Sequence, residues 1–281
     1  SLDEGIFYER KINALKAYYE WMPIRENESK LKIWRKFEIG SLFQLFMLDT
    51  RSIYRDKQLD MESYFTENGF NKIKYKKDLI KNRNLVGKEQ FDWLDKNIDS
   101  KFNWSIIGQQ VLVSPTVLPE IFSKLDKKSL PEYIHKYLKL GGLEIPFNTD
   151  SWDGYPNERD KLFEILSKSQ SNIILTGDTH NSWLSNLFNN NNFLGVEIAT
   201  PSISSPNTID TFGSITDDID NDFVKSNKNL KYTNGSGKGF VQLTICSSHI
   251  DTKFVYVSTI KSKDYKVIDN NTFTINHNKP L

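Results

Sequence analysis

The sequence is poor in the features that would assign a chain of 281 residues to a special class. It contains one cysteine, Cys246, so no disulfide can form within the chain. Its 37 basic and 36 acidic residues nearly cancel, so no bulk charge points to nucleic acid or to an anionic membrane. No stretch reaches the roughly 18 apolar residues that a membrane-spanning helix needs. The charged opening "SLDEGIFYERK" lacks the apolar segment of a signal peptide.

Helical and buried-strand patterns alternate along most of the chain. Apolar residues at three- and four-residue spacing predict three helices, and nearly continuous apolar runs predict four strands covered on both faces. The predicted helices are 3–23, 87–99 and 157–169, and the predicted strands are 41–51, 104–114, 172–183 and 193–205. This alternation predicts a layered α/β fold with a mixed sheet.

Three further segments complete this organisation. Residues 115–158 contain five prolines and predict a long covering or functional loop. Residues 202–238 are rich in Asn, Asp, Ser and Gly, and they predict an irregular connection. Apolar and polar residues alternate on both sides of "SSHID" in 240–259, which predicts a β-hairpin forming an antiparallel edge.

The stretch "ILTGDTH" carries the clearest chemistry in a chain with four histidines. A predicted strand runs into Gly177, which permits a sharp turn, and the polar side chains follow at once. Across the one-residue gap between Asp178 and His180, extended backbone would direct both side chains to one side. A carboxylate and an imidazole so placed can bind a metal ion. The structural alternative is that Asp178 caps a following helix and His180 is an ordinary surface histidine.

Two arginines lie at and just after the end of the strand predicted at 41–51. Arg51 and Arg55 can hold a phosphate group, because the guanidinium fork matches phosphate oxygens. The alternative is that they form ion pairs with Asp49 or Asp56 at the strand end. Of the two arginines, Arg51 is the one expected to approach a ligand cleft beyond the strand ends. We expect Arg51 to be a substrate-binding residue.

The "WDGY" stretch and a glutamine pair are further candidates. Trp152, Asp153 and Tyr155 lie in the long loop before a helix, where a lid could bring Asp153 and Tyr155 to the substrate. In the alternative, Trp152 packs and Asp153 caps the helix. Gln109 and Gln110 interrupt an apolar strand, and we expect a structural role in which a neighbour satisfies a buried amide.

Several ordered segments together resemble PhoD-type alkaline phosphatases of the calcineurin-like metallophosphoesterase superfamily. "LFMLDTRSIYRDKQ" resembles the family's "LDTRxYRDxQ", and "EQFDWLDKNI" and "WSIIGQQVLVSP" resemble its "EQxxWL" and "xxxQQVxxxP" segments. "DSWDGYPNERDKL" matches "DxWDGYxxxR", and "ILTGDTHNSWLSNL" matches "xLTGDxHxSWxxxL". "ALKAYYEWMPIR", "VEIATPSISS" and "NLKYTNGSGKGFVQL" also match, so the resemblance covers nearly all of the chain.

The resemblance implies a fold and a metal site. The fold is the carboxyl-terminal portion of a layered α/β/β/α sandwich, with residues 1–281 forming part of one metallophosphatase domain. Asp178 and His180 correspond to the last metal-binding block, so they are expected to be catalytic ligands of a calcium ion and an iron ion respectively. The upstream blocks, including "WDDHExxxN", are absent from this sequence. We therefore expect weak metal binding and poor activity from this chain alone.

The expected function is hydrolysis of phosphate monoesters or diesters by a periplasmic or extracellular parent protein. The expected partner is a small phosphoester, with no nucleic acid and no membrane segment. One alternative is a phosphatase-like domain that binds a ligand or partner without catalysis. Another is a structural fragment left by truncation. A missing part of the sandwich would also expose sheet edges and lower solubility.

Overall fold

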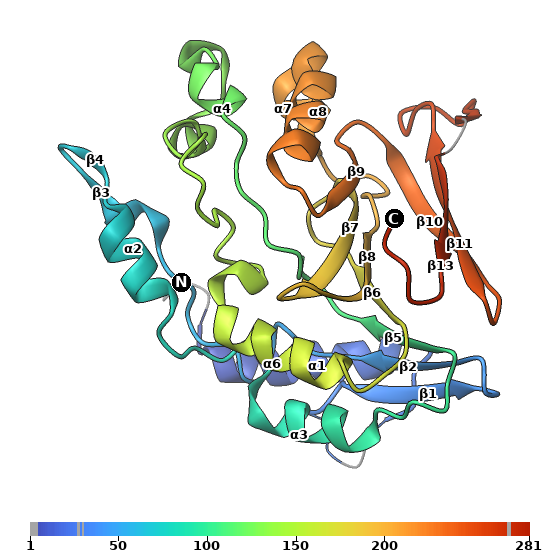
Figure 1. Ribbon diagram of the computed structural model, residues 1–281. Coiled ribbons are helices and arrows are strands. Elements are labelled where there is room, and N and C mark those ends of the chain that lie inside the picture. Colours follow the sequence, from blue (N-terminus) through green and yellow to red (C-terminus); the bar gives the residue numbers. More distant parts are fainter. Residues whose placement is uncertain (1–4, 27–28, 30, 269–270) are drawn as a thin grey trace.

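The computed structural model describes residues 5–26, 29, 31–268 and 271–281. Its centre is a seven-stranded sheet in the order β1-β2-β5-β6-β8-β7-β9 (Figure 1). The strands are β1 (Arg35–Ile39), β2 (Phe43–Met47), β5 (Trp104–Gly108), β6 (Asn172–Thr176), β7 (Ser182–Asn189), β8 (Asn192–Ala199) and β9 (Leu230–Asn234). The series β2, β5, β6 and β8 is parallel, while β1, β7 and β9 each pair antiparallel with a neighbour. The predicted mixed sheet is confirmed.

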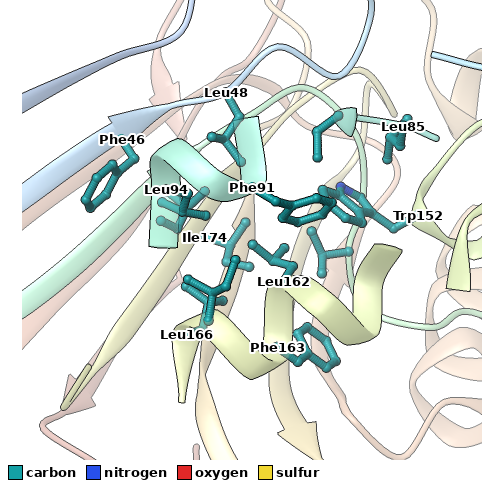
Figure 2. Close-up of a cluster of buried hydrophobic side chains, with 14 of the residues drawn as sticks. Phe46, Leu48, Leu85, Phe91, Leu94, Trp152, Leu162, Phe163, Leu166 and Ile174 are labelled. Atoms are coloured by element: carbon teal, nitrogen blue, oxygen red, sulfur yellow. The ribbon is translucent and has the colours of Figure 1, made fainter. Parts of the chain in front are cut away.

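Helices cover one face of this sheet. The two helices are α3 (Gly87–Asn97) and α6 (Pro156–Leu166). Phe91 and Leu94 from α3 pack with Leu162 and Leu166 from α6 onto strand residues such as Ile174 (Figure 2). These side chains are at most 7% exposed, and each contributes about 1.5–3 kcal/mol of hydrophobic stabilisation. The helices predicted from periodicity at 87–99 and 157–169 are confirmed.

A second sheet covers the other face. It contains β10 (Lys238–Ile245), β11 (His249–Val257), β12 (Val267–Ile268) and β13 (Thr272–Asn276). Ile250 and Phe254 of β11 pack against Ile173 and Val196 of the main sheet. The predicted hairpin in 240–259 is therefore confirmed, but it belongs to a separate sheet and not to an edge of the main one. The result is a helix–sheet–sheet sandwich, in which the central strands are covered on both faces.

Short elements form a third unit beyond the carboxyl ends of the parallel strands. Its helices and strands are β3 (Phe65–Thr66), β4 (Gly69–Phe70), α2 (Lys72–Leu79), α4 (Ile121–Lys124), α5 (His135–Leu138), α7 (Thr208–Phe212) and α8 (Thr216–Ser226), and its 3₁₀ turns are Met61–Tyr64, Lys127–Ser129, Glu132–Ile134 and Gly213–Ile215. Their apolar side chains share one core with Trp183 and Ala199 of the main sheet. In Figure 1 the α4 segment and the α7–α8 pair rise above the same end of the sheet.

Three sequence expectations require correction. The strand predicted at 172–183 is interrupted, because β6 ends at Thr176 and β7 begins after the "GDTH" turn. Strand β7 forms a hairpin with β8, and Asn190 in the turn of this hairpin has a φ of 54°. The "NNNN" stretch between two apolar runs was an available signal for this hairpin. Residues 202–238 are not irregular throughout, because they contain α7, α8 and β9; in α8, Ile219 and Phe223 are buried four residues apart. Strand β1 was also missed.

The amino-terminal helix α1 (Phe7–Trp21) lies within the predicted span 3–23, of which residues 3–4 fall outside the described residues. Leu15 and Tyr19 are buried, but Ile12 and Met22, which lie three residues before Leu15 and three after Tyr19 and so continue the apolar spacing that predicts the helix, are 38% and 48% exposed. In the part of the chain that the structure describes, no helix has the length and apolar character needed to cross a membrane.

Edge strand β1 predicts self-association of this chain. Phe37 and Ile39 are 48% and 52% exposed on a strand whose second hydrogen-bonding edge pairs with no described strand. Such an edge can pair with another copy. We expect the chain to aggregate in light scattering, and the double substitution Phe37→Lys and Ile39→Lys to reduce the aggregate, because edge lysines oppose pairing. A monodisperse, monomeric wild-type sample would contradict this prediction.

Candidate active site

The parallel strands bring four loops to one edge of the sheet. Strands β2, β5, β6 and β8 run in the same direction, so the segments after Met47, Gly108, Thr176 and Ala199 all begin at that edge. In open α/β sheets, ligands bind beyond the carboxyl ends of the strands. The candidates Arg51, Asp178 and His180 all lie in these segments.

Two arginines and two aspartates form an ion-pair cluster at this edge. Arg51 donates from Nη1 to Asp150 Oδ2 at 2.7 Å and from Nη2 to Asp178 Oδ2 at 2.5 Å. Arg55 donates to Asp150 Oδ1 at 2.6 Å. We call Arg51, Arg55, Asp150 and Asp178 the arginine–aspartate cluster. The alternative that the arginines pair with Asp49 or Asp56 is wrong, because their side chains reach across to two other loops.

Asp49 instead shapes the loop that carries Arg51. Its side chain is 1% exposed, and Oδ1 accepts hydrogen bonds from the backbone N–H groups of Arg51 and Ser52 at 2.9 and 2.8 Å. Gln90 fixes Asp49 in turn, because its amide accepts from the Asp49 N–H and donates to the Asp49 carbonyl. Asp49 therefore sets the backbone at Arg51 without pairing with its guanidinium.

The "GDTH" turn differs from the extended geometry expected for it. Asp178 and His180 both have a φ of 66°, in the left-handed region, whereas Gly177 does not lie there. Two such residues within three positions are uncommon, and strain of this kind gathers at functional sites. The Thr179 N–H donates to the Gly177 carbonyl at 2.8 Å, which closes the turn tightly. The helix-capping alternative for Asp178 is wrong, because β7 follows.

His180 is oriented as a metal ligand would be. Its Nδ1–H donates to the carbonyl oxygen of Pro206 at 2.7 Å, so the neutral ring carries its free lone pair on Nε2. Histidines that bind metals commonly donate their other ring N–H to a carbonyl or carboxylate, which fixes the tautomer. His180 and Asp178 are both exposed, with 47% of the Asp178 side chain accessible. The donor chemistry therefore fits a cation.

Within the described ranges, no three His, Cys, Asp or Glu side chains gather as a metal-binding group. Asp178 and His180 are two donors, whereas protein-bound metal ions take four or more ligands. The Arg51 guanidinium supplies the positive charge that neutralises Asp178 in this arrangement.

The "WDGY" residues are buried. Trp152, Asp153 and Tyr155 are 0–1% exposed, and they lie at or beside the 3₁₀ turn Trp152–Gly154 before α6. Asp153 pairs with Arg159 at 2.6 Å and accepts from the Thr116 N–H at 3.1 Å. Burial raises the pKa of Asp153, against the opposing effect of Arg159. These contacts favour packing over a mobile lid, but the expected capping by Asp153 is wrong, because no side chain caps the start of α6.

Tyr155 contacts the arginine–aspartate cluster through Arg55. The Arg55 guanidinium lies 5.1 Å from the centre of the Tyr155 ring, and the Tyr155 hydroxyl donates to the Asp56 carbonyl at 2.7 Å. Burial raises the pKa of Tyr155. The ring therefore supports the arginine that holds Asp150.

Both glutamines lie just beyond the end of β5, and not within a strand that continues to residue 114. Gln109 donates to Thr176 Oγ1 at 2.8 Å and accepts from the Trp152 indole at 3.1 Å. Gln110 accepts from the Thr50 N–H at 2.8 Å and donates to the Leu48 carbonyl at 3.0 Å. Their expected structural role is confirmed, since neighbours satisfy both amides.

Sequence reasoning missed Glu197, a fully buried carboxyl group in β8. It accepts from the N–H groups of Val113 and Ser114 at 2.7 and 2.8 Å and from Thr176 Oγ1 at 2.8 Å. Burial raises its pKa to about 7, against the effect of these hydrogen bonds. Glu197 thus joins the segment after β5 to the strand end that precedes Asp178. An acidic residue within the apolar run "LGVEIA" was the available signal.

Sequence reasoning also missed Asp150, which lies in a Pro- and Gly-rich loop whose fold local patterns do not specify. Asp150 joins both arginines, and its own N–H donates to Asn148 Oδ1 at 3.2 Å. The structure therefore brings Arg51, Asp178 and His180 to one edge, and it adds Asp150 to them.

Comparison with known proteins agrees with this geometry. The model of the PhoD-like phosphatase family matches residues 1–254. The chain is 31% identical over 252 residues to alkaline phosphatase D of Bacillus subtilis (strain 168), covering 85% of this chain and 37% of that protein. A solved structure of PhoD aligns with a TM-score of 0.69 at 25% identity, covering 96% of this chain and 47% of that one. A purple acid phosphatase from yellow lupin (Lupinus luteus) seeds aligns more weakly, with a TM-score of 0.45 at 13% identity.

The chain spans less than half the length of the PhoD relatives it matches. The match nevertheless extends across nine-tenths of its own residues, from the first to the second sheet. The resemblance seen in the sequence is thereby confirmed, and the chain belongs to the PhoD-like phosphatase family.

Proposed function

We propose that this chain is part of a metal-dependent phosphoesterase that hydrolyses phosphate monoesters or diesters. The observation that carries the proposal is that an oriented metal-donor side chain, His180, lies in the same turn as the carboxylate that the Arg51 guanidinium holds. The Pro206 carbonyl occupies Nδ1 of His180 and leaves its Nε2 free, while Asp178, two residues earlier in the same turn, pairs with Arg51, which Asp150 also holds. Membership of the PhoD-like phosphatase family supports the same reaction class.

In this proposal, Asp178 is a ligand of a calcium ion and His180 is a ligand of an iron ion. A bound metal ion would polarise a phosphoryl oxygen and help to supply the attacking nucleophile. The arginine–aspartate cluster is formally neutral, with two cationic and two anionic side chains. An added cation would make the site positive overall, which suits a phosphate anion.

The side chains of this chain have distinct roles in the proposal. Arg51 binds a phosphoryl oxygen through its guanidinium fork, which is why an arginine fits this position better than a lysine. Asp150 orients that fork, and Arg55 fixes Asp150. Tyr155 acts on the substrate indirectly, as a positioning residue packed against Arg55, and Asp153 acts indirectly by fixing the segment before α6 through its pairing with Arg159.

We also propose that this chain alone is catalytically incomplete. Two donor side chains do not complete a metal site, and the chain corresponds to 37% of its Bacillus relative. Further ligands would come from residues outside the sequence described. A periplasmic or extracellular location of the longer protein stays a prediction. The second candidate, a phosphatase-like domain that binds without catalysis, is favoured by the same incomplete donor set.

The test is hydrolysis of p-nitrophenyl phosphate and bis-p-nitrophenyl phosphate with added calcium and iron. A longer protein that carries this chain is expected to turn over one or both esters, and to lose that activity when the metal ions are removed by a chelator. The chain alone is expected to stay at background. Activity that survives chelation would contradict metal dependence. Turnover by the chain alone, abolished by His180→Ala, would contradict incompleteness.

A further inference from the structure

An aromatic cavity of about 230 Å³ lies between the α4–α5 segment, the α7–α8 pair and the main sheet. We define it by six rings, which are Phe122, Tyr137, Phe147, Trp183, Phe212 and Phe223. Figure 1 shows the two helical segments that form its walls, standing above the carboxyl ends of the parallel strands. The cavity has no role in the metal or phosphate chemistry described above.

The rings that form the cavity are packed into a continuous wall. The Phe223 ring lies 5.1 Å from Trp183, 5.8 Å from Phe122 and 6.4 Å from Phe147, measured between ring centres. Phe212 contacts Phe122 at 5.6 Å in an edge-to-face arrangement. Edge-to-face pairs at these distances are favourable. The cavity is therefore a shaped space held by aromatic packing.

The aromatic cavity is joined directly to the "GDTH" turn. The indole of Trp183 donates to Thr179 Oγ1 at 3.0 Å, and Thr179 lies between Asp178 and His180. Thr179 and Asn181, which flank His180 in the chain, are both wall residues. A ligand that fills the cavity would therefore lie beside the proposed metal ligands.

The phosphate side of the site reaches the same cavity. Asn148 and Ser151 are wall residues from the loop that carries Asp150, the partner of Arg51. Both are anchored within their own turn: the Ser151 hydroxyl donates to the Asn148 carbonyl at 2.8 Å, and Asn148 Oδ1 accepts from the Asp150 N–H. The cavity thus has a polar border on two sides, and both sides adjoin the arginine–aspartate cluster.

The interior favours an apolar group over a charged one. Its acidic residue, Asp153, is paired with Arg159, and the Thr116 hydroxyl donates to the Ser114 carbonyl at 3.1 Å. None of the buried side-chain atoms found without a hydrogen-bond partner in the described residues belongs to the wall. A charged ligand group would be costly to desolvate there without a new partner. An apolar cavity of about 150 Å³ is known to accept one benzene ring.

We propose that the aromatic cavity binds the alcohol portion of the phosphoester, and that this portion carries an aryl or branched alkyl group. The inference rests on the proposed function, because it places the ester phosphate at Arg51 and the metal ligands. Burial of the apolar group beside the reacting phosphate would favour such esters over esters of small polar alcohols. The cavity is then the element that selects the substrate.

The binding test uses 4-fluorobenzyl alcohol, which has no phosphate, and fluorine NMR of the full chain. Phe147→Ala and Phe212→Ala each remove a half-buried wall ring, and each is expected to weaken binding of this probe by about tenfold. Phe240→Ala removes an exposed ring of β10 and serves as the matched control. Equal binding by all four proteins, or no binding by wild type, would overturn the inference.

A second measurement needs no substitution. Magnetisation transfer between the bound alcohol and the Trp183 indole is expected in the wild-type chain, and contact with another tryptophan in its place would overturn the inference. In a longer protein that turns over phosphoesters, kcat/KM for phenyl phosphate is expected to exceed that for glycerol phosphate, and Phe147→Ala to reduce this preference. If no ester is hydrolysed while the alcohol still binds at Trp183, the proposed function fails, and the substrate assignment fails with it.

Discussion

Replacing His180 with alanine in a longer protein that carries this chain is expected to lower kcat at least about 100-fold. Loss of the hydrogen-bond partner of a metal-binding residue already lowers metal affinity or activity about 10- to 100-fold, and loss of the metal-binding residue itself is expected to lower them further. Asp178→Asn is expected to have an effect of the same order, because the amide keeps the shape of the side chain but removes the negative charge that pairs with Arg51 and would bind the proposed metal ion.

The measurement is a steady-state assay with p-nitrophenyl phosphate, together with the metal content of each purified protein. His249→Ala is the matched control, since His249 lies in β11 of the second sheet and its side chain faces Asp251 at 3.7 Å. Unchanged kcat in either site variant would exclude the ligand role. Lost activity with an unchanged metal content would instead assign the residue to substrate positioning.

The second large effect concerns Glu197 and the pH dependence of stability. Its folded-state pKa is raised from 4.5 to about 7 by burial, so the folded protein binds a proton more tightly than the unfolded chain does. Its contribution to stability is therefore fully present below about pH 4.5 and is lost as the pH rises through 7. A shift of this size corresponds to about 3 kcal/mol.

Urea denaturation of wild type and Glu197→Gln at pH 5 and pH 8 measures this effect. Glutamine does not titrate, so the stability difference between the two proteins is expected to change by about 2.5 kcal/mol between these pH values, in the direction that favours wild type at pH 5. Glu164→Gln changes an exposed carboxyl group of α6 and serves as the control. A difference that is the same at both pH values would contradict the raised pKa.

The Glu197→Gln substitution also disturbs the hydrogen bonds that join this residue to the candidate active site. Both Glu197 oxygens accept backbone N–H groups, so the NH₂ group of glutamine would face one of these donors. Leaving a buried group unsatisfied costs about 1–3 kcal/mol. The same change loosens contacts around Thr176, two residues before Asp178.

Local sequence patterns predicted the elements whose side chains repeat at a regular spacing. Helices α3 and α6 and the hairpin β10–β11 follow from periods of 3.6 and 2, because those periods reflect which face each element buries. The patterns failed at the boundary between two strands that follow each other in the chain. The predicted strand 172–183 runs through the turn into the first two residues of β7, since periodicity alone does not show that the chain reverses at Asp178 and His180.

For the site, the chain order of "LDTR" and "GDTH" by itself determined the candidate chemistry: a guanidinium, a carboxylate and an imidazole, each placed after an apolar strand. The tertiary structure decided which of these groups meet. Arg51 pairs with Asp150 and Asp178, 99 and 127 residues further along the chain, and not with nearby Asp49 or Asp56.

The physical reason is that the parallel strands carry distant loops to one sheet edge, whereas local spacing constrains side chains within a few residues of each other. The aromatic cavity has the same origin. Its rings come from α4, α5, the loop before α6, β7, α7 and α8, and packing between these segments forms the space beside Thr179 and Asn181. The sequence determined the donor groups, and the packing of distant segments decided their partners and the cavity next to them.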